Sequence, residues 1–141
     1  MIYLDSCALI KLIVPEPLSV ALLGYLDTRA EPLVSSELAF VEVHRALTRV
    51  GVAEDVRAVA DQVLDGITQL PLAPVVRQAA VLPGRYLRSL DALHLATALR
   101  VPTTHFVSYD KRLNQAAELA GLEVRAPGWP STAGPGAVQS A

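Results

Sequence analysis

Short apolar runs alternate with longer segments of helical period along almost all of the 141 residues. This pattern predicts strands at 2–5, 32–36, 70–74, 105–109 and 123–127, and helices at 6–14, 20–29, 37–51, 53–67, 75–82, 90–101 and 111–121. Pro15 and Gly51 stand where two of these helices are expected to end. Strands that alternate with helices predict an α/β domain with a central, mainly parallel sheet and helices on both faces.

Composition indicates a single globular domain. Apolar residues make up 52% of the chain and charged residues 18%, which is enough apolar material to build a core. We expect the domain to span residues 1–127, followed by a flexible tail at 128–141 that is rich in Gly, Pro, Ser and Ala. Trp129, at the start of this tail, could stack on a nucleic-acid base or pin the tail to the surface.

Charge and cysteine content narrow the classes of function. The single cysteine, Cys7, cannot form an internal disulfide, which is typical of the reducing cytoplasm. No apolar stretch is long enough to span a bilayer and no basic segment precedes the N-terminal apolar run, so we expect neither a membrane span nor a secretory signal. A net charge of −2 argues against a large basic surface, so any contact with nucleic acid would be local.

Two acidic residues follow predicted strands directly. Asp5 ends the first apolar run, and Asp110 comes just after the run at 105–109. Because ligands of parallel sheets bind beyond the carboxyl ends of the strands, we expect both side chains at one edge. Asp110 could equally serve as the N-cap of the helix that follows it.

Two further acids lie on predicted helices. In LDALHLATAL apolar residues surround the helix on every side, so Asp91 is expected against the core, where a bound ion or a basic partner would account for it. Alternatively, Asp91 is an ordinary first-turn acid that the helix dipole stabilises. Glu42 falls on the border of its helix's apolar face, where it could lean toward a cleft or pair with Arg45 one turn on.

The acids suit a hard metal ion better than other catalytic groups. The sequence has no GxxxxGK[ST], GxGxxG or HExxH motif, and one cysteine with scattered histidines makes a zinc site improbable. Oxygen ligands alone favour Mg²⁺ or Mn²⁺. Four clustered carboxylates would repel one another, and one or two divalent ions would relieve that repulsion.

Four segments resemble PIN-domain ribonucleases, and most closely the VapC toxins of bacterial toxin–antitoxin pairs. They are DSCALIKL, SSELAFVEV, LRSLDALHLATAL and FVSYDKRL, in that order, and the resemblance covers about residues 1–126. It implies a three-layer α/β/α sandwich and a Mg²⁺- or Mn²⁺-dependent endoribonuclease whose ions are held by Asp5, Glu42, Asp91 and Asp110. Ser6 and Ser108 stand where the family often has Thr or Ser, and would orient ligands or waters behind these acids.

The resemblance also implies a cellular role and partners. The expected enzyme is a toxin that cleaves structured RNA, such as tRNA or rRNA, to stop translation and growth. A VapB-type antitoxin would neutralise it, and it would form a homodimer. Candidates for contact with RNA phosphates are Lys11, Arg45, Arg49, Arg85, Arg88, Lys111 and Arg112.

Two other functions remain open from the residues. A phosphatase could use Asp5 as nucleophile, although such enzymes usually carry a second Asp two residues on, where this chain has Cys7. A binding module could use the acids only to hold a structural ion and act through a protein partner. Cys7 itself is expected to be a small apolar helix residue, and His94 a hydrogen-bonded core histidine.

Overall fold

The computed structural model describes residues 1–130 and contains a five-stranded sheet. The strands are β1 (Ile2–Leu4), β2 (Leu33–Ser36), β3 (Thr68–Leu70), β4 (His105–Val107) and β5 (Val124–Arg125). Their order is β3-β2-β1-β4-β5, and every neighbouring pair is parallel. The predicted parallel sheet is confirmed, while most of the predicted tail, residues 131–141, lies outside the described residues.

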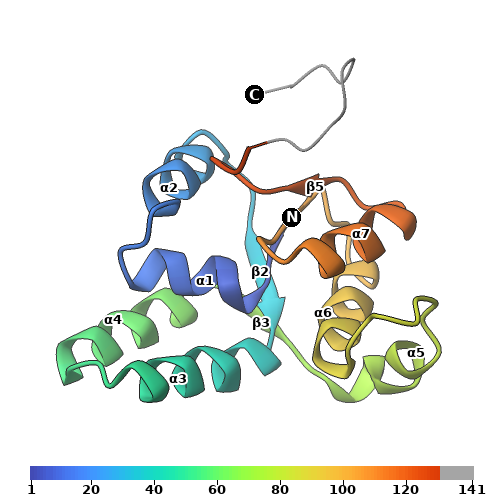
Figure 1. Ribbon diagram of the computed structural model, residues 1–141, viewed down its shortest axis with the longest axis horizontal. Helices are drawn as coiled ribbons and strands as arrows, with labels where there is room; N and C mark the ends of the chain where they lie inside the picture. Colours follow the sequence, from blue (N-terminus) through green and yellow to red (C-terminus); the bar gives the residue numbers. More distant parts are fainter. Residues whose placement is uncertain (131–141) are drawn as a thin grey trace.

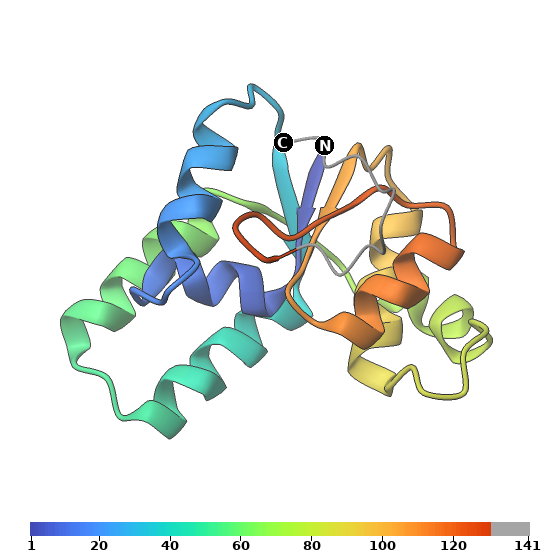
Figure 2. The same ribbon diagram turned by 45° about the horizontal axis from the view of Figure 1, so that its top comes forward.

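Helices cover both faces of the sheet (Figures 1 and 2). One face carries α1 (Ser6–Ile13), α2 (Ser19–Asp27), α3 (Leu38–Val50) and α4 (Glu54–Asp65). The other carries α5 (Val76–Ala80), α6 (Ser89–Leu99) and α7 (Lys111–Leu119). The three-layer α/β/α sandwich expected from the sequence is therefore the observed architecture.

The alternation of side chains along β1 explains why the protein has a core on each side. Ile2 and Leu4 point into the core under α1 to α4, whereas Tyr3 points into the core under α6 and α7. All three side chains are fully buried, because β1 is the central strand with a partner on each side. The end of β1 is thus held rigidly, and Asp5 follows it at once.

Several predicted boundaries were wrong. The third strand is Thr68–Leu70 instead of 70–74, because Pro71 has no N–H to donate to a neighbouring strand, and residues 73–75 form a 3₁₀ turn. The last two strands are shorter than predicted. Gly51 does end α3, in the left-handed conformation that glycine adopts most easily, with φ of 75°.

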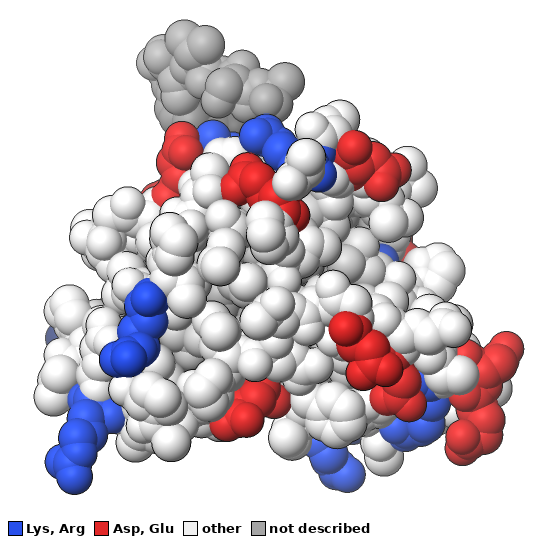
Figure 3. Space-filling view, turned by 180° about the vertical axis from the view of Figure 1, so that it is seen from behind, with Lys and Arg blue, Asp and Glu red and all other residues white. Residues whose placement is uncertain are grey.

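The described surface fits the low net charge of the chain. On the face opposite that of Figure 1, charged side chains lie mainly toward the edges, with Lys and Arg interspersed with Asp and Glu, and the centre carries few charges (Figure 3). No helix within residues 1–130 combines the length and apolarity needed to cross a membrane.

Candidate active site

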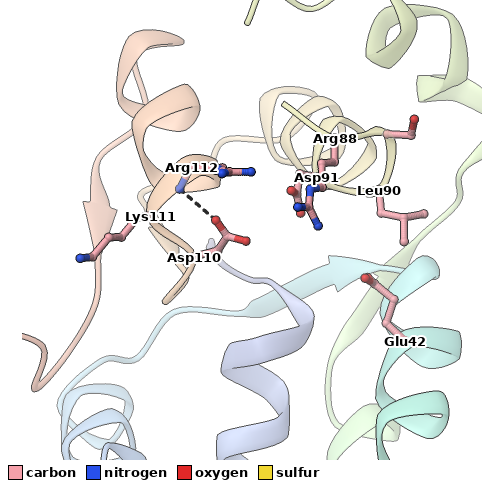
Figure 4. Close-up of a pocket in the computed structure, with 8 residues that line it drawn as sticks. Glu42, Arg88, Leu90, Asp91, Asp110, Lys111 and Arg112 are labelled. Atoms are coloured by element: carbon pink, nitrogen blue, oxygen red, sulfur yellow. Dashed lines mark hydrogen bonds between the residues drawn. The ribbon is translucent and has the colours of Figure 1, made fainter. Parts of the chain in front are cut away.

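Acidic side chains from four elements meet at the carboxyl edge of the sheet. Glu42, Asp91 and Asp110 line a cleft of about 550 Å³ between α3, α6 and the start of α7 (Figure 4). Asp5 lies buried beside it, near enough that its charge contributes to the raised pKa of Asp91. The convergence expected from the two strand ends is therefore present in the fold, although the roles of these residues stay predictions.

Asp5 is almost completely buried, with 4% of its surface exposed. Its Oδ1 accepts a hydrogen bond from the backbone N–H of Ala8 at 2.9 Å, so it caps α1. Its Oδ2 accepts one from the Ser108 hydroxyl at 2.5 Å. Burial nevertheless raises the pKa of Asp5, against the effects of His94 and of the donors that surround the carboxylate. Asp5 is thus the N-cap of α1, and its role in the site stays a prediction.

Ser108 connects two of the four acids. While its hydroxyl donates to Asp5, its oxygen accepts the backbone N–H of Asp110 at 3.1 Å. The Asp110 Oδ1 caps α7 by accepting the N–H groups of Arg112 and Leu113, at 2.9 and 3.1 Å. This leaves Oδ2 of Asp110 free of these capping bonds. Ser108 thus lies between Asp5 and Asp110, and its role in orienting ligands or waters stays a prediction.

Asp91 lies in the first turn of α6 and is partly buried. Burial raises its pKa, and the charge of Asp110 raises it further, with smaller contributions from Asp5 and Glu42. The helix is less enclosed than the sequence suggested, since Leu90 beside Asp91 is 49% exposed. Its first turn faces the cleft, and the buried residues of the helix are Ala92 and those from His94 to Ala98.

Glu42 turns toward the cleft from α3 (Figure 4). A histidine contacts its carboxylate. Its Oε1 lies 2.5 Å from Nε2 of His94, and the Nδ1 of that ring lies 2.7 Å from the Tyr3 hydroxyl. The alternative pairing of Glu42 with Arg45 does not occur among the ion pairs of the described residues. His94 is the buried, hydrogen-bonded histidine that was predicted, but its link to Glu42 was not foreseen.

The four acids form no ion pair with a Lys or Arg among the described residues. Within residues 1–130, none of the ion pairs joins Asp5, Glu42, Asp91 or Asp110 to a basic side chain other than His94. The same residues contain no group of three or more His, Cys, Asp or Glu side chains already close enough to form a metal-coordinating cluster. Carboxylates that share a site without forming a complete cage fit Mg²⁺ or Mn²⁺, because such ions keep several waters and take one or two carboxylates directly.

The remaining predicted residues divide into two groups. Arg88, Lys111 and Arg112 line the cleft, whereas Arg45, Arg49 and Arg85 do not. Lys11 pairs with Glu16 at 2.9 Å and lies over the Tyr109 ring. Ser6 opens α1, and its side chain forms no hydrogen bond with the four acids in the part of the chain described, so its supporting role stays a prediction.

Cys7 contributes more than a small apolar side chain. Its Sγ donates to Asp5 at 3.0 and 3.2 Å, and burial followed by the Asp5 charge raises the pKa of the thiol well above its usual range. The thiol is therefore protonated and acts as one of the donors to Asp5. A spacing of two residues after the acid was the only sequence signal for this contact.

Trp129 packs beside the site without lining the cleft. Its ring lies 5.9 Å from that of Tyr109, with the Lys111 ammonium 5.7 Å from its centroid. The Tyr109 hydroxyl donates to the carbonyl of Pro127 at 2.9 Å. These contacts hold the start of the tail against the domain, which agrees with the interpretation that Trp129 pins the tail to the surface.

Comparison with known proteins agrees with this geometry. Residues 2–119 match the PIN domain family. Two relatives from Mycobacterium tuberculosis are each 45% identical to the chain: Ribonuclease VapC35, over 91% of this chain and 98% of its own, and Ribonuclease VapC46, over 89% and 97%. The solved structure of VapC20 from the same species, a sarcin-ricin loop cleaving toxin, shares the fold with a TM-score of 0.69 at 16% identity, over 86% of this chain and 96% of that one. A match of this extent, with relatives of this identity, shows that the chain belongs to the PIN-domain family and within it to the VapC-type ribonucleases.

Proposed function

We propose that this protein is a metal-dependent endoribonuclease that acts as the toxin of a toxin–antitoxin pair. The observation that carries the proposal is the meeting of four acids from separate elements at one sheet edge, without a Lys or Arg ion pair among the described residues. Like charges held together raise the energy of the folded protein unless a cation joins them. A site of this kind is better explained by a ligand than by stability.

Asp5, Asp91 and Glu42 would hold the ion directly, and Asp110 would hold it directly or through a water. A bound Mg²⁺ or Mn²⁺ would supply a water of lowered pKa and stabilise negative charge on the scissile phosphate. The protein's own contribution is to hold its carboxylates in place at the cleft. Ser108 and the Ala8 N–H fix Asp5, while the α7 backbone fixes Asp110.

Arg88, Lys111 and Arg112 are the basic side chains suited to the RNA backbone. All three are exposed and line the cleft beside Asp91 and Asp110. Three cations near the acids agree with a local contact on a chain of net charge −2. They would bind phosphates flanking the cleavage point, and would be sensitive to salt as other phosphate contacts are.

The wider cellular role follows from the family. We infer that the enzyme acts in the cytoplasm on structured RNA, such as tRNA or rRNA, and that a VapB-type antitoxin neutralises it. An antitoxin for this cleft would present a basic side chain, such as an Arg, to the unpaired carboxylates. The exposed apolar side chains Phe40, Val41 and Leu90, at 46%, 56% and 49% exposure, are candidates for the homodimer interface.

RNA cleavage with and without divalent metal tests the proposal. Wild type should cleave RNA with Mg²⁺ or Mn²⁺ and lose this activity with chelator. Asp91→Asn should lose at least about 100-fold in kcat/KM, or ~3 kcal/mol of transition-state stabilisation. Asp65→Asn is the matched control, because Asp65 is an exposed acid at the end of α4 and lines no part of the cleft.

Two results would contradict this function. Cleavage that persists in chelator, or that survives Asp91→Asn unchanged, would remove the metal-dependent mechanism. Growth arrest that survives Asp5→Asn in cells would favour the alternative, a non-catalytic module that acts through a protein partner.

A further inference from the structure

We propose that His94 is a positioning residue for Glu42, and that Tyr3 holds His94 in the orientation this requires. The consequence for metal binding rests on the proposed function. The geometry itself does not, since it links three side chains from different elements: Tyr3 from β1, His94 from α6 and Glu42 from α3.

The two hydrogen bonds of the ring determine where its proton points. The Tyr3 hydroxyl lies 2.7 Å from Nδ1 of His94, and a phenol hydroxyl can donate its hydrogen to that nitrogen. With Nδ1 as acceptor, the ring proton is on Nε2, which lies 2.5 Å from Oε1 of Glu42. A carboxylate can only accept at this distance, so Nε2–H is the donor that Glu42 needs.

Tyr3 and His94 are buried and fixed in place, whereas Glu42 is partly exposed. Tyr3 is fully buried and its ring stacks on Phe106 at 5.3 Å, while His94 is 2% exposed. The Glu42 side chain, by contrast, is 23% exposed and reaches the cleft. A glutamate on the border of a helix face has several rotamers open to it, and the bond to His94 selects the one that reaches the cleft.

The interaction leaves Glu42 free to bind a ligand. His94 occupies Oε1, and among the described hydrogen bonds Oε2 receives none. A histidine that donates to a carboxylate in this way orients it, as outer partners of metal ligands commonly do. The structure therefore assigns His94 a role in the site even though it does not line the cleft.

Mn²⁺ affinity, measured by calorimetry on the full chain, tests this role with three variants. His94→Leu removes both hydrogen bonds and should weaken Mn²⁺ binding about 10- to 100-fold. His94→Gln keeps an N–H donor for Glu42 and should bind within about fivefold of wild type. Tyr3→Phe, which deletes only a hydroxyl, should fall between the two and serves if His94→Leu does not fold.

The chain offers a matched control at the other end of the sheet. His105 is also buried, contacts the Tyr25 hydroxyl through Nδ1, and lies 3.4 Å from Glu123 through Nε2. His105→Leu should leave Mn²⁺ affinity within about twofold of wild type, because this residue is remote from the acids. Unfolding in urea with chelator reports the stability of every variant separately.

A double-mutant cycle separates positioning from general damage. If His94 acts through Glu42, His94→Leu should weaken Mn²⁺ binding far less in a Glu42→Gln background than in wild type. Full additivity of the two substitutions, or unchanged affinity in both His94→Leu and Tyr3→Phe, would overturn the proposal.

The positioning of Glu42 by His94 can be tested even if the proposed function is wrong. Wild type that binds no Mn²⁺ would refute the metal site, and the metal-free crystal structure of His94→Leu, or of Tyr3→Phe, would then test the positioning alone. Glu42 should leave the cleft in that structure. An unchanged Glu42 rotamer would overturn the assignment.

Discussion

The two ends of the sheet carry the same trio of residue types in opposite electrostatic settings. At the carboxyl end, Tyr3 and His94 hold Glu42 beside three aspartates. At the amino end, Tyr25 and His105 approach Glu123. The acids at the amino end have cationic partners, since Arg125 pairs with Glu123 at 3.1 Å and the N-terminal amine with Glu31 at 3.2 Å.

The pKa shifts at the two ends run in opposite directions. Hydrogen bonding by Arg125 lowers the pKa of Glu123, and hydrogen bonding by Thr104 and the N-terminal amine lowers that of Glu31. Burial raises the pKa of Asp5 and of Asp91, and neighbouring carboxylates raise the latter further. The lowered pKa values at the amino end favour the folded state when these carboxylates are ionised, whereas the raised pKa values at the carboxyl end oppose it. On the proposed function, a bound ion would balance the charges at the carboxyl end.

The largest predicted effect is the difference in RNA cleavage between variants that lack one acid at the carboxyl end or one acid at the amino end. Asp5→Asn is expected to reduce RNA cleavage by at least about 100-fold in kcat/KM, because a carboxylate proposed to hold the ion is lost. Glu31→Gln, at the amino end, should stay within about twofold of wild type. Steady-state cleavage of one defined RNA measures both, and equal losses would break the contrast.

Loss of the Ser108 hydroxyl should destabilise the protein more than loss of the Thr104 hydroxyl at the amino end. Ser108→Ala leaves Oδ2 of buried Asp5 without its hydroxyl donor, which should lower the free energy of unfolding by about 1–3 kcal/mol. Thr104→Ala removes an exposed acceptor of the N-terminal amine and should change it by less than about 0.5 kcal/mol. Urea denaturation of both variants gives the comparison, and a Ser108→Ala protein as stable as wild type would argue against the bridge.

The smallest predicted effects are changes in the free energy of unfolding, and they should have opposite signs at the two ends of the sheet. In chelator, Asp91→Asn should make the protein slightly more stable, by about 0.5 kcal/mol after allowance for solvent screening, because it relieves repulsion among the acids. Glu123→Gln should make it less stable, since it removes a carboxylate whose pKa is lowered.

The pH dependence of that gain follows from the raised pKa values. A carboxyl with a higher pKa in the folded state adds stability when protonated, so the metal-free protein gains stability as the pH falls through the folded pKa of Asp91 toward the unfolded value of about 3.9. The advantage of Asp91→Asn over wild type should therefore shrink between pH 7 and pH 4. Urea denaturation across this range tests it, and an advantage that grows on acidification would contradict the raised pKa.

The sequence predicted the parts of this molecule that depend on pattern. Alternating strands and helices defined the layers, and the carboxyl-end rule brought Asp5 and Asp110 to one edge. Asp91 stood out because apolar residues follow it on every side of its helix. Strand ends were predicted less well, because they depend on local features such as Pro71 and on where neighbouring strands stop.

Contacts between residues far apart in sequence could not be predicted in this way. Glu42 and His94 are 52 residues apart, and Tyr3 and His94 are 91 apart. Their meeting requires the packing of α3 and α6 against the sheet, which no local pattern specifies. The same holds for Ser108 and Asp5, which only the resemblance to a known family brought together in advance.

Calorimetric titration of the metal-free protein with Mn²⁺ tests the central claim most directly, that the carboxyl end is an ion site and the amino end is not. Wild type and Glu123→Gln should bind Mn²⁺ with the same affinity, and Asp91→Asn should bind at least about 100-fold more weakly. Equal binding by wild type and Asp91→Asn, or loss of binding in Glu123→Gln, would contradict the account.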